Sequence, residues 1–95
     1  MNGVYVGNNR VLVRLAWGGL MYVPGQDMSI SPYLISDGFI EKPLTKYLSS
    51  TLKKGWKCID VGANIGYYAV LFSVLVGKQG AVSAFEADPK VFAYL

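Results

Sequence analysis

The sequence predicts an α/β fold in which a βαβ unit follows a leader made of a β-hairpin and a helix. Two short apolar strands, residues 57–61 and 81–85, flank an apolar helix that is predicted over residues 66–76. Glycines mark the turn between the first strand and the helix, and an acid ends the second strand. Strand, glycine turn, helix, strand and terminal acid in this order are typical of a βαβ unit with parallel strands.

The first part of the chain has the pattern of short strands. The segments 4–6, 10–16 and 20–23 are predicted as short strands, and within the second of them Val11, Val13 and Leu15 alternate with Leu12, Arg14 and Ala16. The pair Gly18-Gly19 between two of them predicts a hairpin turn. Residues 24–40 are rich in Pro, Gly, Ser and Asp, so we expect a loop with one helical turn.

A helix is predicted over residues 41–52. Pro43 falls in its first turn and Gly55 lies just past its end. Apolar side chains on one face predict that the helix packs on the sheet. These side chains are Leu44, Tyr47, Leu48 and Leu52. Two roles stay open for Glu41 at the helix start: it could reach the site from the leader, or satisfy the helix macrodipole.

The turn and the terminal acid are suited to bind a nucleoside. Gly62 and Gly66 lack a Cβ atom, so the backbone can turn tightly there and approach a ligand closely. The first N–H groups of the following helix are unpaired and point toward that ligand. Glu86 ends the neighbouring strand, where a carboxylate can accept hydrogen bonds from both hydroxyls of a ribose.

The residues also indicate which nucleoside ligand fits. The dinucleotide fingerprint would need glycines at Asn64 and Tyr67, and the chain has no phosphate-cradling P-loop motif. Asp60 at the strand end repels phosphate and suits an amine. A ligand with a ribose, a cationic amino end and no phosphates fits this pattern, which predicts S-adenosylmethionine as the cofactor.

The same residues carry a family resemblance. The segment 60–68, Asp-Val-Gly-Ala-Asn-Ile-Gly-Tyr-Tyr, is followed by Val-Ser-Ala-Phe-Glu-Ala-Asp-Pro, and together they resemble the FkbM-type methyltransferases. The resemblance runs from about Gly55 to the end of the chain, and residues 20–24 and 37–41 are similar to that family's leader, though less specifically. Ala87 departs from the family, which usually carries Pro there.

The resemblance implies a class I, Rossmann-like methyltransferase fold that uses S-adenosylmethionine. It also implies O-methylation of a hydroxyl group on a small molecule or sugar. Two alternatives stay open: another class I methyltransferase that acts on RNA or protein, and a non-catalytic fragment that only associates with itself.

The motif and the resemblance together predict the cofactor-binding residues, which are Asp60, Gly62, Ala63, Asn64, Gly66, Tyr67, Glu86 and Ala87. We favour Asp60 as the partner of the ligand's amino group over a cap for turn amides. A structural role and a ligand contact are equally favoured for Asn64, which tolerates left-handed backbone. Of Tyr67 and Tyr68, one is expected to pack in the core and the other to line the pocket. Asp88 is expected to cap a helix.

The length of 95 residues suggests a truncated domain. A class I fold needs several more strands, and parallel strands need helices on both faces. We therefore interpret residues 1–40 as a leader and residues 41–95 as the start of a truncated cofactor-binding domain. The hydrophobic content of 53% is typical of a piece of a larger core. By itself the chain is expected to be inactive and self-associated, and no catalytic residue is predicted, because the substrate-binding side chains follow later strands.

The charge pattern does not favour a nucleic acid partner. The net charge is +3, and lysines gather around one helix and its exit: Lys42, Lys46, Lys53, Lys54 and Lys57. A basic face can bind nucleic acid or an acidic substrate. A solvated surface is the favoured interpretation, since Tyr47 is the one aromatic residue we place on that face.

The remaining composition predicts a cytoplasmic protein without metal. Cys58 is the single cysteine and lies among apolar neighbours, so a buried reduced thiol is favoured over a nucleophile. No residues have metal-ligand spacing. Residues 1–20 lack the continuous apolar core of a signal peptide. The longest apolar run, residues 67–76, is about half a membrane span, so no membrane partner is expected.

Overall fold

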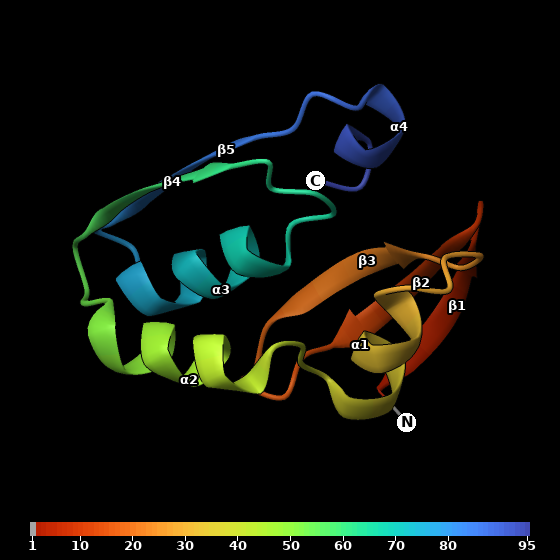
Figure 1. The fold of residues 1–95 in the computed structure, drawn as a ribbon, viewed down its shortest axis with the longest axis horizontal. Helices are drawn as coiled ribbons and strands as arrows, with labels where there is room; N and C mark the ends of the chain where they lie inside the picture. Colours follow the sequence, from red (N-terminus) through yellow and green to blue (C-terminus); the bar gives the residue numbers. More distant parts are fainter. Residues whose placement is uncertain (1) are drawn as a thin grey trace. The chain divides into compact units, whose positions relative to one another are not determined.

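The computed structural model describes residues 2–95 and divides the chain into two compact units, Met1–Thr45 and Lys46–Leu95. A three-stranded sheet lies in the first unit and a two-stranded sheet in the second (Figure 1). Among the described residues, no helix has both the length and the apolar character that crossing a membrane requires.

The sheet of the first unit is antiparallel, with the order β1-β2-β3. Its strands are β1 (Gly3–Gly7), β2 (Arg10–Arg14) and β3 (Leu20–Pro24), close to the predicted segments. In the β1–β2 turn, Asn8 and Asn9 both have positive φ angles, of 53° and 57°. Two positive φ angles characterise the tight hairpin turns that follow the twist of the strands, and Asn tolerates this backbone well.

The hairpin predicted at the glycine pair is confirmed. The strands β2 and β3 pair in register, and in the turn the Leu15 N–H donates a 2.7 Å hydrogen bond to the Gly19 carbonyl. One face of the sheet is buried and forms the core of this unit with a side chain of the helix α1 (Ser31–Asp37). The core side chains are Val11, Val13, Leu15, Met21, Val23 and Leu34.

The helix α1 corrects the prediction of a loop with one helical turn over residues 24–40, because it is seven residues long. The Asp27 side chain explains why the helix forms. Its carboxylate accepts hydrogen bonds from the backbone N–H groups of Ser29, Ile30 and Ser31, at 3.2, 2.8 and 2.8 Å. It thereby satisfies donors at the start of the helix that would otherwise be unpaired. Burial favours the neutral acid, but these hydrogen bonds outweigh it and hold the pKa of Asp27 well below its ordinary value.

Replacing Asp27 by Ala is expected to lower the free energy of unfolding by about 1 kcal/mol, the usual cost of losing such a cap. Because the pKa of Asp27 is lower in the folded state, its contribution is complete above the unfolded-state value of 3.8. That contribution is lost as the pH falls from there toward the folded-state pKa. Denaturant titrations at pH 7 and pH 3 measure both effects. Asp37→Ala, at an exposed acid in the same unit, is the control, and an equal loss in both variants would contradict the cap.

The helix α2 (Lys42–Thr51) confirms the predicted helix, but its apolar face does not pack as predicted. Leu44 and Tyr47 are exposed, while Leu48 and Leu52 are half-buried. The helix α3 (Tyr67–Val76) packs on the two-stranded sheet instead. Periodicity reveals that a helix has an apolar face, but it does not say which surface that face meets.

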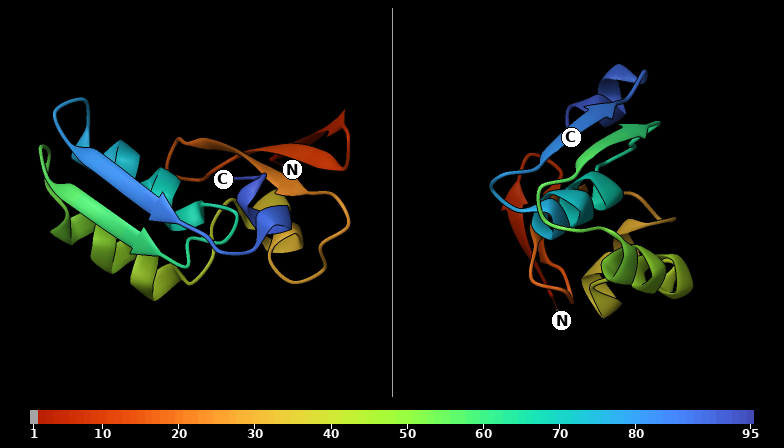
Figure 2. Two further views of the ribbon diagram at one scale, coloured as in Figure 1. Left: turned by 90° about the horizontal axis from the view of Figure 1, so that it is seen from above. Right: turned by 90° about the vertical axis from the view of Figure 1, so that its left-hand side faces the viewer.

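The second unit contains the predicted βαβ arrangement. The strands β4 (Lys57–Val61) and β5 (Ala81–Phe85) are parallel and paired in register, with the bounds that the sequence predicts. Figure 2 shows the two strands side by side, with α3 on one side of them. Tyr67, Leu71 and Val76 of α3 are buried, while the remainder of this apolar helix is only partly covered. A short helix, α4 (Pro89–Phe92), follows β5.

Candidate functional site

The two strand ends of the second unit bring the predicted site residues together. The loop after β4 is joined to the end of β5 by two hydrogen bonds to the carbonyl of Phe85. The N–H groups of Gly62 and Ala63 donate these bonds, at 2.8 and 2.9 Å. Because parallel strands end at the same edge of a sheet, the glycine turn and the acid after β5 become neighbours.

Glu86 connects the two loops through its carboxylate. One oxygen, Oε1, accepts a 2.8 Å hydrogen bond from the Asn64 N–H, and Oε2 accepts a 3.0 Å hydrogen bond from the Asp88 N–H. The prediction that the glycine turn and Glu86 lie next to each other is therefore confirmed. Each carboxylate oxygen has two lone pairs, so Glu86 retains acceptor capacity for ligand hydroxyls.

The backbone of the turn requires residues that tolerate positive φ. Gly62, Asn64 and Gly66 have φ angles of 72°, 57° and 101°. A Cβ atom at Gly62 would meet nothing within 4 Å, so the space beside this glycine is open. Asn64 thus has the structural role that was one of its two predicted roles, while its N–H also binds Glu86. The turn combines a specific backbone shape with open space for a ligand.

Asp60, at the end of β4, contains a polar atom without a partner. Its Oδ2 atom is buried and accepts no hydrogen bond, and burial raises the pKa of this carboxyl. This oxygen therefore does not cap the turn, which was the alternative role for Asp60. An unsatisfied buried acceptor costs free energy, so the atom favours a donor that a ligand brings. An ammonium group supplies donors of the right charge.

Three of the predicted site residues are buried inside the unit: Ala63, Gly66 and Tyr67. Tyr67 is only 3% exposed and packs edge-on against Tyr68, with ring centroids 5.0 Å apart. Tyr67 is thus the tyrosine of the pair that packs in the core. Ala63 is also buried, so both residues support the turn from within. The Asp88 side chain caps α4 as predicted, because it accepts a 2.9 Å hydrogen bond from the Lys90 N–H.

A cavity of about 540 Å³ opens beside the two strand ends. Its lining comprises Val61, Gly62, Ala84, Phe85, Glu86, Ala87 and Phe92. Three predicted residues belong to it, whereas Val61, Ala84 and Phe92 were not singled out from the sequence. Val61 is the last residue of β4, and that position alone could have indicated it. Phe92 reaches the cavity because α4 folds back, which no local pattern reveals.

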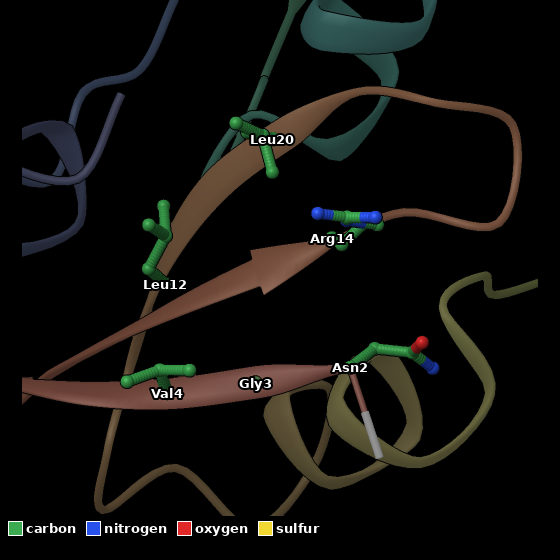
Figure 3. Close-up of a pocket in the computed structure, with 6 residues that line it drawn as sticks. All are labelled: Asn2, Gly3, Val4, Leu12, Arg14 and Leu20. Carbon is green, nitrogen blue, oxygen red and sulfur yellow. The ribbon is translucent and has the colours of Figure 1, made fainter.

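A second cavity of about 330 Å³ lies in the first unit, on the face of the sheet away from its core (Figure 3). Figure 3 shows Val4, Leu12 and Leu20 on neighbouring strands, with Arg14 at the end of β2. This cavity has no carboxylate in its lining, in contrast to the cavity at the strand ends of the second unit, which Glu86 lines.

The described residues offer no metal centre. Within residues 2–95, no group of three His, Cys, Asp or Glu side chains is placed to hold a metal ion. Cys58 is a free, half-buried thiol on β4. The candidate site is built from backbone groups, carboxylates and apolar side chains.

A family model described as Protein-L-isoaspartate(D-aspartate) O-methyltransferase matches residues 13–94. The chain belongs to this methyltransferase family. The match supports the class and the cofactor that the motif predicts, since methyltransferases of this family use S-adenosylmethionine. It does not support the FkbM type specifically. No curated protein matches the chain.

The observed geometry is compatible with the cofactor of this methyltransferase family. The unpartnered oxygen of Asp60 suits a cationic amino group, and Glu86 retains lone pairs for hydroxyls. The open space at Gly62 allows close approach to the backbone. Phosphates have no comparable partner at this edge, because both side chains carry negative charge. These features agree with a nucleoside that has an amine and no phosphate.

Proposed function

We propose that this chain carries the S-adenosylmethionine site of an O-methyltransferase of the FkbM type, whose acceptor is a hydroxyl of a small molecule or sugar. One observation supports the cofactor site above the others. The carboxylate of Glu86 and the glycine turn are hydrogen-bonded neighbours at the carboxyl ends of two parallel strands. An acid and a glycine turn in this arrangement are suited to bind a ribose and the aliphatic chain attached to it.

Each residue of the proposed site has its own task. Glu86 accepts hydrogen bonds from the ribose hydroxyls, and Asp60 holds the amino group. Gly62 admits the ligand close to the backbone, and the apolar side chains of Phe85 and Phe92 line the cavity. The bound cofactor supplies a methyl group on a positively charged sulfur, which is open to displacement by an oxygen nucleophile. These residues therefore bind and align the cofactor, and alignment is the main source of catalysis in such a transfer.

A second candidate acceptor is the isoaspartyl carboxylate of a protein. The printed description of the matched family names this acceptor, and the match covers most of the chain. The two acceptors differ in whether a proton must be removed before or during methyl transfer. A carboxylate is already ionised at neutral pH and can attack directly, whereas a hydroxyl must lose its proton to a base during the transfer.

Calorimetry with the protein is expected to show binding of S-adenosylhomocysteine and no comparable binding of NAD. Transfer of labelled methyl groups from S-adenosylmethionine then tests the acceptor, with a panel of sugars and small alcohols beside an isoaspartyl peptide. For a hydroxyl acceptor, the rate should rise with pH as the base loses its proton.

Each possible result of these measurements has a defined meaning. Labelling of the peptide alone, at a rate independent of pH above about 5, would show that the methyl acceptor is the isoaspartyl carboxylate and not a hydroxyl. Equal affinities for NAD and S-adenosylhomocysteine would overturn the cofactor assignment itself.

A further inference from the structure

The helix α1 and the loop that joins it to α2 line a further cavity, of about 290 Å³, in the first unit. Figure 1 shows this loop between the two labelled helices. The cavity is lined by Tyr33 and Asp37 of α1 and by Phe39, Ile40 and Glu41 of the loop. We call it the aromatic–acidic cavity. It shares no lining residue with the candidate cofactor cavity, and its volume is at the lower end of the range for small-molecule pockets.

The loop wall of this cavity is held in place through its backbone carbonyls. The Gly38 carbonyl accepts a 2.8 Å hydrogen bond from the Ala16 N–H, and a Cβ atom at Gly38 would lie 2.8 Å from the same nitrogen. Buried Thr45 binds the other end of the loop. Its hydroxyl donates a 2.8 Å hydrogen bond to the Ile40 carbonyl, and its N–H donates a 3.0 Å hydrogen bond to the Glu41 carbonyl. Glu41 is thereby held at a φ angle of 44°, so the shape of the wall is set before any ligand binds.

Two aromatic rings and two carboxylates meet in the lining. Tyr33 and Asp37 are about one turn apart on α1, so their side chains project from the same side of the helix. The Asp37 Oδ1 atom accepts a 3.2 Å hydrogen bond from the Ser36 hydroxyl, and Oδ2 keeps its lone pairs for a ligand. The loop contributes the Phe39 ring and the Glu41 carboxylate, and the described lining residues include no Lys or Arg. The cavity therefore combines negative charge with the faces and edges of aromatic rings.

We infer that the aromatic–acidic cavity binds an organic ammonium cation. The faces of aromatic rings attract such a cation through their quadrupole, and the two carboxylates attract its charge. An anion would be repelled by both carboxylates. A bare metal cation requires several oxygen ligands in its coordination shell, and ring faces supply none. The same ammonium chemistry occurs in a free amine such as choline and in the lysine side chain of a peptide.

A lysine of the chain itself shows that a ring of this cavity attracts ammonium groups. The Lys42 Nζ atom lies over the Phe39 ring, 5.9 Å from the ring centroid, which is near the outer limit of a cation–π contact. Lys42 does not line the cavity, so its charge competes from outside with a bound cation. Lys42→Gln should therefore strengthen the binding of an ammonium ligand, by about two- to threefold.

A pair of ligands with the same shape tests the inference on the unmodified chain. Choline and 3,3-dimethylbutan-1-ol differ in the charge at their branched end, and NMR titration measures the affinity of each. We expect choline to bind with a dissociation constant on the order of 1 mM, and the neutral alcohol to bind at least about tenfold more weakly. Equal affinities, no binding of choline, or its displacement by an equal concentration of potassium chloride would overturn the inference. A peptide with a single lysine, compared with choline, shows which source of the ammonium group binds more tightly.

Variants that keep the size of a side chain test the rings and the charges separately. Phe39→Leu removes a ring, while Asp37→Asn and Glu41→Gln each remove one charge, and each should weaken choline binding by about fivefold. Tyr22→Leu, at an aromatic residue that is 44% exposed on β3, and Asp88→Asn, at an exposed acid of the second unit, are the controls and should leave the affinity unchanged. Circular dichroism checks that each variant is folded. Equal losses in the controls, or unchanged affinity in all three cavity variants, would overturn the inference.

Saturation with S-adenosylhomocysteine tests whether this cavity is separate from the cofactor site. Choline should bind with the same affinity in its presence, because the two cavities share no lining residue. Displacement of choline would assign the cavity to the cofactor site and overturn it as a site of its own. The titrations with choline alone include no cofactor, so their outcome is independent of the proposed methyltransferase function.

Discussion

Replacing Glu86 by Ala is expected to weaken the binding of S-adenosylhomocysteine by roughly 1–3 kcal/mol, which corresponds to a factor of about 5–150 in the dissociation constant. Two losses combine in this variant. The ribose hydroxyls lose a charged acceptor, and the N–H groups of Asn64 and Asp88 lose the carboxylate that joins their loops. The glycine turn should then be less well ordered before the ligand binds, and calorimetry measures the total effect.

The Glu86 experiment has two controls. Glu86→Gln retains one acceptor oxygen without the charge, so its affinity should lie between those of the wild type and Glu86→Ala. Asp88→Asn removes a neighbouring negative charge but can still cap α4, and it should bind with nearly wild-type affinity. An unchanged affinity in Glu86→Ala would show that Glu86 is not the ribose acceptor.

Replacing Gly62 by Ala is expected to reduce cofactor affinity by at least about tenfold, because the added methyl group occupies the open space where the ligand approaches the backbone. The positive φ of 72° at this position also makes any side chain unfavourable. That strain should lower the free energy of unfolding by about 1–2 kcal/mol. Calorimetry and denaturant titration report the two effects separately.

Gly55 offers a matched control for this change. It has a φ angle of 89°, and a Cβ atom there would also meet nothing within 4 Å, but it lies at the opposite end of β4. Gly55→Ala should therefore cost similar stability and leave cofactor affinity unchanged. A similar loss of affinity in both variants would mean that Gly62 acts through the fold alone, without direct approach by a ligand.

The sequence predicts the second unit well because its signals are local. The strands 57–61 and 81–85 are short apolar runs bounded by glycines and charges, and their observed bounds agree with the prediction. The fold class and the methyltransferase class follow from the same segment, and the family match over residues 13–94 confirms both. The cofactor-binding roles of the eight predicted residues stay predictions.

Three structural features were not predicted from the sequence, because they depend on side-chain capping or on residues distant in the sequence. The length of α1 depends on Asp27, whose carboxylate binds three backbone N–H groups of a segment that composition alone marks as loop. The apolar face of α2 was predicted to pack on the sheet, but α3 occupies that position. Phe92 lines the cavity because α4 turns back toward the strand ends.

By itself the sequence determined the order of the elements and the chemistry of the turn after β4. The turn requires positive φ angles, which glycine and asparagine tolerate, and an acid follows the neighbouring strand. These residue preferences act over a few positions, so the sequence reveals them directly. Tertiary structure decided which carboxylate oxygens receive hydrogen bonds and which do not. Parallel pairing places the Asn64 N–H on Glu86, while burial leaves an oxygen of Asp60 without a donor. Both outcomes depend on atoms contributed by different elements, and only folding brings those atoms together.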